Sequence, residues 1–240
     1  MFPLRDENPH PPGFKPKVTY ALIIANVIVF FIEVAYTGQF FDFTNQNAFN
    51  LFYNWGAVPN CVTGASFSTI SFGAEPVRIL CPSTPYISLI TSTFMHGGLM
   101  HLGGNLLFLW IFGDNIEQKF GKVKYLGIYL MWGVVAGLIH IYGDTSSVIP
   151  AVGASGAISG ILGAYLVIFP KARIQTFLML GFFWRMMHIQ ARWFLPFWLV
   201  FQNLLPFFIG GFGVAGGGVA YLAHIGGFVI GLATGYIYKK

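Results

Sequence analysis

The sequence contains few charged residues: among 240 residues there are thirteen Lys and Arg and eight Asp and Glu, or 9% of the chain. A globular protein needs more charge than this to cover its surface with solvated groups, so the composition excludes an ordinary soluble domain. Hydrophobic residues make up 55% of the chain, and several apolar runs are long enough to cross a bilayer. The sequence therefore predicts a multi-pass membrane protein that is surrounded by lipid.

The sequence also lacks the motifs of three classes of membrane protein. No histidine is followed by glutamate, which excludes an H-E-x-x-H zinc protease. Glu33 is the only acidic residue well inside an apolar run, whereas an aspartyl intramembrane protease needs two. A transporter is expected to have an internal repeat and a pair of broken helices, and the sequence shows neither. We therefore expect neither a metal nor another cofactor.

The basic residues lie almost entirely on one side of the predicted membrane spans. Twelve of the thirteen flank the spans on that side, and only Arg78 falls on the other. The positive-inside rule makes the side with the twelve residues the cytoplasm. We expect both termini to be cytoplasmic and the membrane to be a prokaryotic cell (inner) membrane. The pattern needs no nucleic-acid partner to explain it.

Six apolar runs predict an all-α fold, a bundle of six transmembrane helices. They cover residues 18–36, 88–113, 125–142, 155–169, 193–208 and 220–238. The run 174–190 is interrupted by Arg185 and His188, so we expect it to lie at the inner interface. Residues 1–17 are predicted to form a cytoplasmic segment and residues 18–240 a single membrane domain.

Two connecting segments carry further expectations. Residues 37–86 form a long outer loop, rich in aromatic residues, that is too large for a simple connector. It contains both cysteines, Cys61 and Cys81, which form a disulfide if that side is oxidising or stay as free thiols otherwise. The glycine-rich segment 210–218 is predicted to be a flexible cap beside the fifth span.

The stretch that points to chemistry is Gly153-Ala-Ser-Gly156, where a polar loop becomes an apolar helix. A serine between glycines at a helix mouth can be a nucleophile, because small neighbours let a substrate backbone approach. Alternatively, Gly156 and Gly160 form a GxxxG packing face, which is common in membrane helices. His224, in a second glycine-rich apolar helix, favours the nucleophile because it supplies a base.

Depth in the membrane supports this pairing. Ser155, His224 and Asn105 lie sixteen, fifteen and fourteen residues before the basic residues that flank their helices. At 1.5 Å per residue these separations correspond to roughly 24, 22 and 21 Å above the inner boundary. The three polar side chains are therefore predicted at one level inside a hydrocarbon core about 30 Å thick. Polar groups at such a depth are functional candidates by default.

These stretches also resemble a known family. The segments His96-Gly-Gly-Leu-Met-His101-Leu-Gly-Gly-Asn105, Gly153-Ala-Ser-Gly156 and Ala223-His224-Ile-Gly-Gly227, in this order, are similar to motifs of rhomboid intramembrane serine proteases of the six-span prokaryotic type. The first outer loop departs from many relatives because it contains no Trp-Arg pair.

The resemblance implies an endopeptidase that cuts transmembrane protein substrates near the outer face of the membrane. Ser155 would be the nucleophile and His224 its base, and no acidic third member is implied. Asn105 and His101 would stabilise the oxyanion together with the backbone N–H of Ser155. His96, Gly153, Gly156 and Gly227 would be structural. The alternative is an inactive relative that binds or sorts transmembrane clients, and loss of Ser155 or His224 would favour it.

Overall fold

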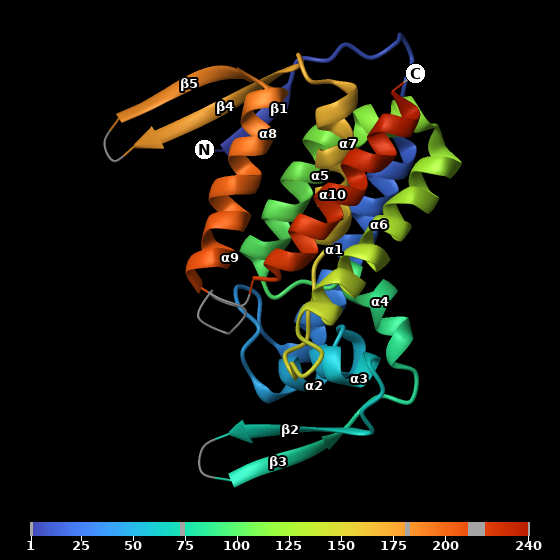
Figure 1. The fold of residues 1–240 in the computed structure, drawn as a ribbon, viewed down its shortest axis with the longest axis vertical. Helices are drawn as coiled ribbons and strands as arrows, with labels where there is room; N and C mark the ends of the chain where they lie inside the picture. The colour runs from blue at the N-terminus through green and yellow to red at the C-terminus, as the bar shows by residue number, and fades with distance from the viewer. Residues whose placement is uncertain (1, 73–74, 181–182, 211–218, 240) are drawn as a thin grey trace.

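The computed structural model describes residues 2–72, 75–180, 183–210 and 219–239, and most of these residues are helical (Figure 1). The bundle is built from α1 (Lys17–Thr37), α5 (Leu99–Phe120), α6 (Lys122–Gly143), α7 (Ser155–Ile168) and α10 (Tyr221–Tyr238). Both chain termini lie at one end of it, together with β1, β4 and β5, and we call this the basic end. The opposite end carries α2, α3, β2 and β3, and we call it the loop end.

Among the described residues, three helices are long and apolar enough to cross a membrane: α1, α6 and α10, with mean hydropathies of 2.3, 1.6 and 1.2. The helix α7 is apolar but shorter, with fourteen residues. Lipid-facing surfaces are expected to be apolar, and Ile24, Ile28, Phe31 and Ile32 on α1 are all more than half exposed. The chain is therefore an integral membrane protein, whereas six crossings stay a prediction.

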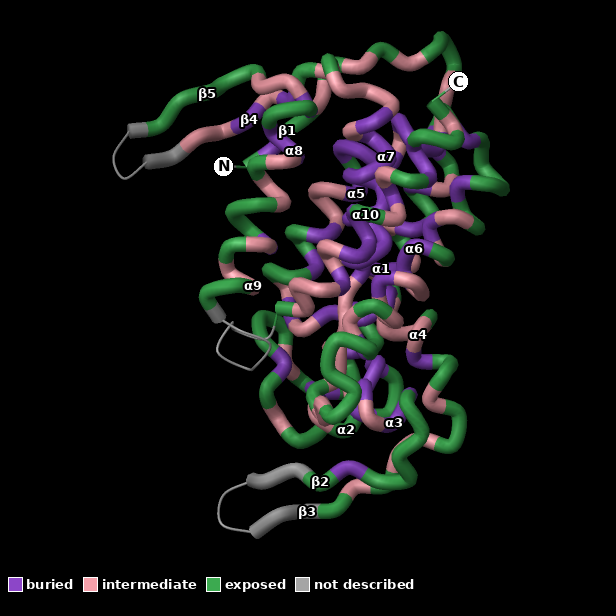
Figure 2. Tube along the Cα trace, in the orientation of Figure 1, coloured by how far each residue is buried: buried purple, intermediate pink, exposed green. Residues whose placement is uncertain are grey.

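The core of the bundle surrounds α7, whose residues are buried on nearly every side (Figure 2). The sequence of α7 contains no charged residue, as expected for a helix with no face toward solvent. Its closest neighbour is α10. A Cβ placed on Gly231 of α10 would lie 2.1 Å from the carbonyl oxygen of Gly160 on α7, so only glycine allows the two backbones to approach this closely.

The predicted second span, residues 88–113, is not one helix. It consists of α4 (Ser88–Thr91), a 3₁₀ turn η2 (Ser92–Phe94), an extended segment 95–98, and α5. Gly98 has φ of +151°, and a Cβ there would lie 1.9 Å from the carbonyl oxygen of Phe41, which accounts for the break. The backbone of this segment is paired instead with the chain after α1, through the bond from Phe43 N–H to the Gly97 carbonyl.

At the other end of that span, α5 continues beyond the predicted limit at residue 113, to Phe120. Glu117 is buried at 1% exposure, and its carboxylate accepts hydrogen bonds from the backbone N–H groups of Val18 and Thr19 and from the Thr19 hydroxyl. These N–H groups begin α1 and would otherwise have no partner. Glu117 therefore joins the start of α1 to the last turns of α5.

The expectation of an all-α fold is wrong at the basic end. The described residues of the segment 174–190, predicted to lie at the inner interface, pair as the antiparallel strands β4 (Arg173–Leu180) and β5 (Phe183–Gln190). The N-terminal strand β1 (Phe2–Asp6) pairs with the other edge of β4, in the order β1-β4-β5. Ile174 and Thr176 are fully buried while their neighbours are not, which is the two-residue period of a strand.

The predicted fifth span is interrupted as well. It forms α8 (Ala191–Leu199), a π-helical stretch η3 (Val200–Leu204) and α9 (Leu205–Gly210). Pro196 lies inside α8 and has no N–H to donate to the carbonyl of Arg192, which weakens regular helical bonding here. Of the predicted flexible segment 210–218, residues 211–218 lie outside the described residues.

The long segment 37–86 at the loop end is folded in its described parts. It contains α2 (Gln46–Trp55), α3 (Pro59–Val62), the hairpin of β2 (Phe67–Phe72) and β3 (Glu75–Leu80), and the 3₁₀ turn η1 (Pro85–Ile87). Cys61 and Cys81 form a disulfide with a Cα–Cα distance of 5.4 Å. The bond joins α3 to the chain just after β3, beside the buried ring of Tyr53.

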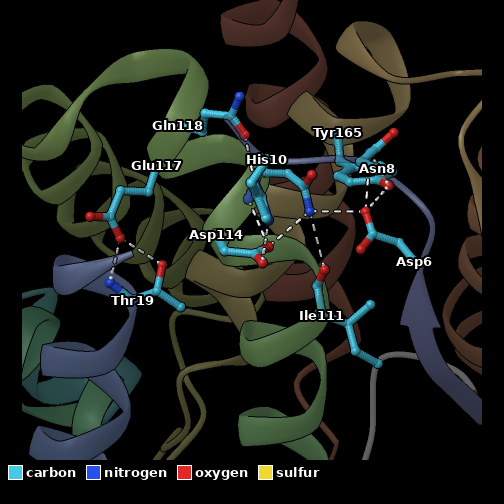
Figure 3. A network of polar contacts seen from close by, with 10 residues as sticks. Asp6, Asn8, His10, Thr19, Ile111, Asp114, Glu117, Gln118 and Tyr165 are labelled. Atoms are coloured by element: carbon cyan, nitrogen blue, oxygen red, sulfur yellow. Dashed lines mark hydrogen bonds and ion pairs between the residues drawn. The ribbon is translucent and has the colours of Figure 1, made fainter. Parts of the chain in front are cut away.

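A polar network fastens the N-terminal residues to the basic end of the bundle (Figure 3). The carboxylate of Asp6 accepts hydrogen bonds from the Tyr165 hydroxyl at 2.6 Å and from the Asn115 amide at 2.9 Å. His10 lies between the carboxylate of Asp114, at 2.9 Å, and the amide oxygen of Gln118. The strand β1 is therefore bound by side chains of α5 and α7 as well as by the backbone of β4.

We expect this attachment to weaken as the pH rises. Burial lowers the pKa of His10, but its hydrogen bonds to Gln118 and Asp114 and the charges of Asp114 and Asp6 outweigh burial and raise the pKa above its ordinary value. Protonation of His10 therefore stabilises the attached state. That stabilisation is complete below the ordinary histidine pKa of about 6.5 and is lost as the pH rises through the raised value.

Hydrogen exchange of the β1 backbone, corrected for the intrinsic pH dependence of exchange, measures this effect. Protection should fall between pH 6 and pH 8 in the natural chain and should vary much less in His10→Gln. His188→Gln is the matched control, because His188 lies 3.3 Å from Glu7 at the same sheet. An unchanged pH dependence in His10→Gln would assign the effect to another group.

Candidate active site

Ser155 is the first residue of α7, and the loop before it is fixed in place by backbone hydrogen bonds. Ala151 pairs with Ala57 in both directions, at 2.9 and 3.0 Å, and the N–H of Gly153 donates to the Ser92 carbonyl at 2.8 Å. Gly153 has φ of +130°, a conformation that other residues rarely adopt. This turn delivers Ser155 to the helix start, where backbone N–H groups lack helical partners.

His224 lies in the first turn of α10 and contacts Ser155 directly. Its Nε2 atom is 2.7 Å from Ser155 Oγ, which is hydrogen-bonding distance. The contact is possible because α7 and α10 pack closely along their glycines, which we call the glycine seam. A Cβ on Gly227 of α10 would lie 2.1 Å from the carbonyl oxygen of Gly156 on α7. Of the three glycines predicted to be structural, Gly156 and Gly227 therefore lie between the two helices, and Gly153 lies in the turn before Ser155.

His101 and Asn105 lie on one face of α5, and His101 lies close to Ser155. A Cβ on Gly153 would lie 2.8 Å from His101 Nε2 and 3.5 Å from Ser155 Oγ, so the imidazole stands just across Gly153 from the serine. The N–H of Gly97 donates to His101 Nδ1 at 3.2 Å. In a neutral imidazole the other nitrogen, Nε2, then carries the proton and is a donor on the serine side.

The side chain of Asn105 is hydrogen-bonded within its own helix. It is buried at 7% exposure, and its amide nitrogen donates to the backbone carbonyl of His101 at 3.1 Å, within its own helix. One N–H of the amide is used by this bond, so a second N–H is left for another acceptor. Its expected contribution to an oxyanion stays a prediction.

His96 does not lie on a helix, because it belongs to the extended segment before α5. It is fully buried, and its ring packs edge-on against that of His101, with centroids 5.2 Å apart. Its backbone N–H donates to the carboxylate of Glu33 on α1, at 3.1 and 3.3 Å. Glu33, the acid inside the first apolar run, therefore caps a backbone group at the helix break rather than facing Ser155.

A small cavity of about 40 Å³ adjoins the serine. A water molecule needs roughly 10–15 Å³ of such space and two or more polar partners. The polar residues of its wall are Ser92, Thr93, His140 and Ser155. His140, in the last turn of α6, therefore lines a space that water can fill.

One polar contact of the site was not predicted from the sequence. Asn203, in the π-helical stretch η3, is buried at 1% exposure, and its Oδ1 atom lies 2.6 Å from His224 Nδ1. The signal that could have found it is an amide in the middle of an apolar span, since buried polar groups need partners. The neighbouring Gln202 is also an amide but is exposed. The sequence alone does not say which of these two amides faces the site.

Comparison with known proteins identifies the family of the chain. A model of the "Rhomboid domain" matches residues 83–240. The chain is 29% identical over 165 residues to "Rhomboid protein 1, mitochondrial" of Saccharomyces cerevisiae, an alignment that covers 65% of this chain and 43% of the yeast protein. It is 34% identical over 110 residues to "Rhomboid protease GluP" of Bacillus subtilis, covering 45% of this chain and 21% of that protein.

A third similar protein is the human "Presenilin-associated rhomboid-like protein, mitochondrial", with 33% identity over 106 residues, 43% of this chain and 27% of the human protein. The chain thus spans less than half the length of these curated relatives. The matched region contains Ser155, His224, His101 and Asn203, and it covers well over half of the chain. The chain therefore belongs to the rhomboid family.

Proposed function

We propose that this chain is an intramembrane serine endopeptidase in which Ser155 is the nucleophile and His224 the general base. The observation that carries the proposal is the 2.7 Å contact between Ser155 Oγ and His224 Nε2, at the mouth of an apolar helix. A serine hydroxyl is a weak nucleophile unless an adjacent base accepts its proton. A half-buried serine and imidazole in contact supply both groups.

The reaction proceeds by acyl transfer. As Ser155 Oγ attacks the scissile carbonyl, its proton moves to His224 Nε2, and the carbonyl oxygen becomes an oxyanion. The leaving amine then takes the proton from His224, and the peptide bond breaks to leave an acyl-enzyme. A water activated by the same imidazole hydrolyses the ester, and the cavity beside Ser155 is large enough to hold one.

Donors for the oxyanion are available on two sides of the serine. The backbone N–H of Ser155 points from the helix start, and His101 Nε2 lies across Gly153. Asn105 joins them through the amide N–H that is not bonded to the His101 carbonyl. These donors would be worth most in the transition state, where the negative charge develops.

Transmembrane protein segments are the proposed substrates, cut near the loop end of the bundle. The topology that goes with this proposal has six crossings, both termini in the cytoplasm and a prokaryotic cell membrane. A helical substrate hides its carbonyls in i→i−4 hydrogen bonds, and unwinding it in lipid strands polar groups. Cleavage should therefore occur in the outer third of a span or just outside it, at sites weakened by Gly, Pro or polar residues.

A fluorophosphonate probe tests the proposal in the detergent-solubilised chain. The probe should label the natural protein, and mass spectrometry should locate the adduct on Ser155. Mass spectrometry should also locate the cut sites in a panel of transmembrane substrates. These sites should cluster in the outer third of each substrate's span or just outside it. A folded protein that neither reacts with the probe nor cleaves any of the panel would favour the inactive, client-binding alternative.

Asn105→Ala should lower kcat by about 10²–10³ while changing KM much less, because an oxyanion donor acts in the transition state rather than in the bound substrate. Steady-state cleavage of one transmembrane substrate in detergent gives both constants, and the thermal unfolding midpoint checks the fold. An effect on KM alone would make Asn105 a substrate-binding residue. A fall in the unfolding midpoint large enough to account for the lost activity would make it a helix-packing residue.

A further inference from the structure

The Nδ1 side of His224 faces Asn203, a residue that the proposed reaction does not yet use. Asn203 Oδ1 is 2.6 Å from His224 Nδ1, and the side chain is 1% exposed. The contact joins η3 to α10, across 21 residues of chain. An amide this deeply buried is costly unless both its oxygen and its nitrogen find partners.

The orientation of the Asn203 amide follows from its second contact. Its Nδ2 donates to the backbone carbonyl of Trp198, five residues earlier, at 3.4 Å. The π-helical geometry of η3 brings residues five apart into register, so a side-chain donor can reach this carbonyl. With the nitrogen directed to Trp198, the oxygen must be the atom that faces His224.

An amide oxygen can only accept a hydrogen bond, so His224 must carry its proton on Nδ1 in order to donate to Asn203. In the neutral ring, Nε2 then has a free lone pair, directed at Ser155 Oγ at 2.7 Å. This is the tautomer that a general base requires. A histidine held in the other tautomer presents an N–H to the serine and cannot accept its proton, and such an error can cost about 10⁴ in rate.

We propose that Asn203 is a positioning residue that completes a Ser155–His224–Asn203 triad by fixing the tautomer and ring orientation of His224. The inference rests on the proposed function for its catalytic meaning, but the tautomer itself is a property of the resting protein. It differs from a simple tether between η3 and α10 because it depends on an acceptor atom at Oδ1, not on the volume of the side chain.

Two variants of nearly equal size separate these roles. Asn203→Asp keeps an oxygen acceptor beside Nδ1, whereas Asn203→Leu fills the same space without one. We expect Asn203→Leu to lower kcat and the rate of fluorophosphonate labelling by about 10- to 100-fold with little change in KM, since His224 remains but is no longer held. Asn203→Asp should restore most of the lost rate. Gln202→Leu, at the exposed neighbour, should match the natural chain.

The tautomer is measured without reference to activity, by ¹⁵N NMR of histidine-labelled protein, with the His224 signal assigned by its loss in His224→Ala. In the natural chain we expect Nδ1 to be protonated and Nε2 not, and in Asn203→Leu a mixture of both forms. A natural chain with the proton on Nε2 would overturn the proposal even if every Asn203 variant failed to fold. So would a folded Asn203→Leu protein with the natural kcat.

The two readouts also separate this inference from the proposed function. Protonated Nδ1 in a protein whose serine does not react with the probe would leave Asn203 as the orienting partner but refute the protease. Labelling of Ser155 with equal rates in the natural chain and Asn203→Leu would support the protease and refute the triad.

Discussion

Ser155→Ala and His224→Ala should each reduce cleavage of a transmembrane substrate by about 10⁴–10⁶ while leaving the protein folded. The reason is that one side chain supplies the attacking oxygen and the other accepts its proton, and neither step proceeds without its partner. The double variant should be little worse than either single one, because residues that act as a unit lose their function together. Single-turnover cleavage in detergent gives the three rates.

Ser159→Ala is the matched control for this series. Ser159 lies one turn after Ser155 on the same helix and is buried at 1% exposure, yet it has no contact with His224 among the described hydrogen bonds. The same chemical change there should leave cleavage within a few-fold of the natural rate. Substantial activity in a folded Ser155→Ala protein would refute the proposed mechanism. So would a double variant whose loss in rate is the product of the two single losses.

The candidate Ser–His pair could be predicted because its signal is local and repeated. Ser155 and His224 each stand in a glycine-rich stretch, and counting from the basic flanks puts both at one depth. Glycines four residues apart also indicate which helices pack closely, and the structure has Gly231 against Gly160. The catalytic roles themselves stay predictions until they are measured.

The helix break before α5 could not be predicted, because its cause lies elsewhere in the chain. Gly97 and Gly98 permit an extended segment, but an apolar helix with two glycines is equally compatible with the sequence. The break is stabilised by Glu33, which is 63 residues away and accepts the N–H of His96. A contact of this kind has no signature in a window of neighbouring residues.

The hairpin of β4 and β5 was missed for a related reason. An apolar run with two polar interruptions fits an interfacial helix and a strand pair about equally well. The strand pair is favoured because β1, near the N-terminus, pairs with β4 from Phe2 to Asp6 and extends the sheet. The role of Asn203 could not be predicted for the same reason. Its partner His224 is 21 residues later, and the π-helical stretch that orients Asn203 has no sequence motif.

Gly227→Ala and Gly231→Ala should be among the most damaging single-methyl changes outside the dyad. A Cβ at either position would lie 2.1 Å from a backbone carbonyl oxygen of α7, that of Gly156 or of Gly160. Backbone in a packed helix cannot move aside as the end of a side chain can, so α10 must shift away from α7. Overpacking of this kind typically costs ~1–3 kcal/mol and occasionally more.

Gly127→Ala on α6 is the matched control, because a Cβ there meets nothing within 4 Å. It should stabilise the helix by ~0.5–1 kcal/mol, since alanine loses less backbone entropy than glycine. Thermal unfolding in detergent should rank the natural chain and Gly127→Ala above both seam variants. Unfolding midpoints for Gly231→Ala that match those of Gly127→Ala would show that the seam is looser than these distances require.

The two seam variants should differ in how activity follows stability. Gly227 faces Gly156, the residue after Ser155, so a displacement there acts directly on the 2.7 Å contact with His224. Gly231 lies one helical turn further from the serine. At a temperature where both proteins are folded, Gly227→Ala should therefore label with a fluorophosphonate at least tenfold more slowly than Gly231→Ala, because a shift of about 1 Å can cost 10² in rate. Equal labelling rates would mean that α10 moves as a rigid body and that the dyad tolerates the displacement.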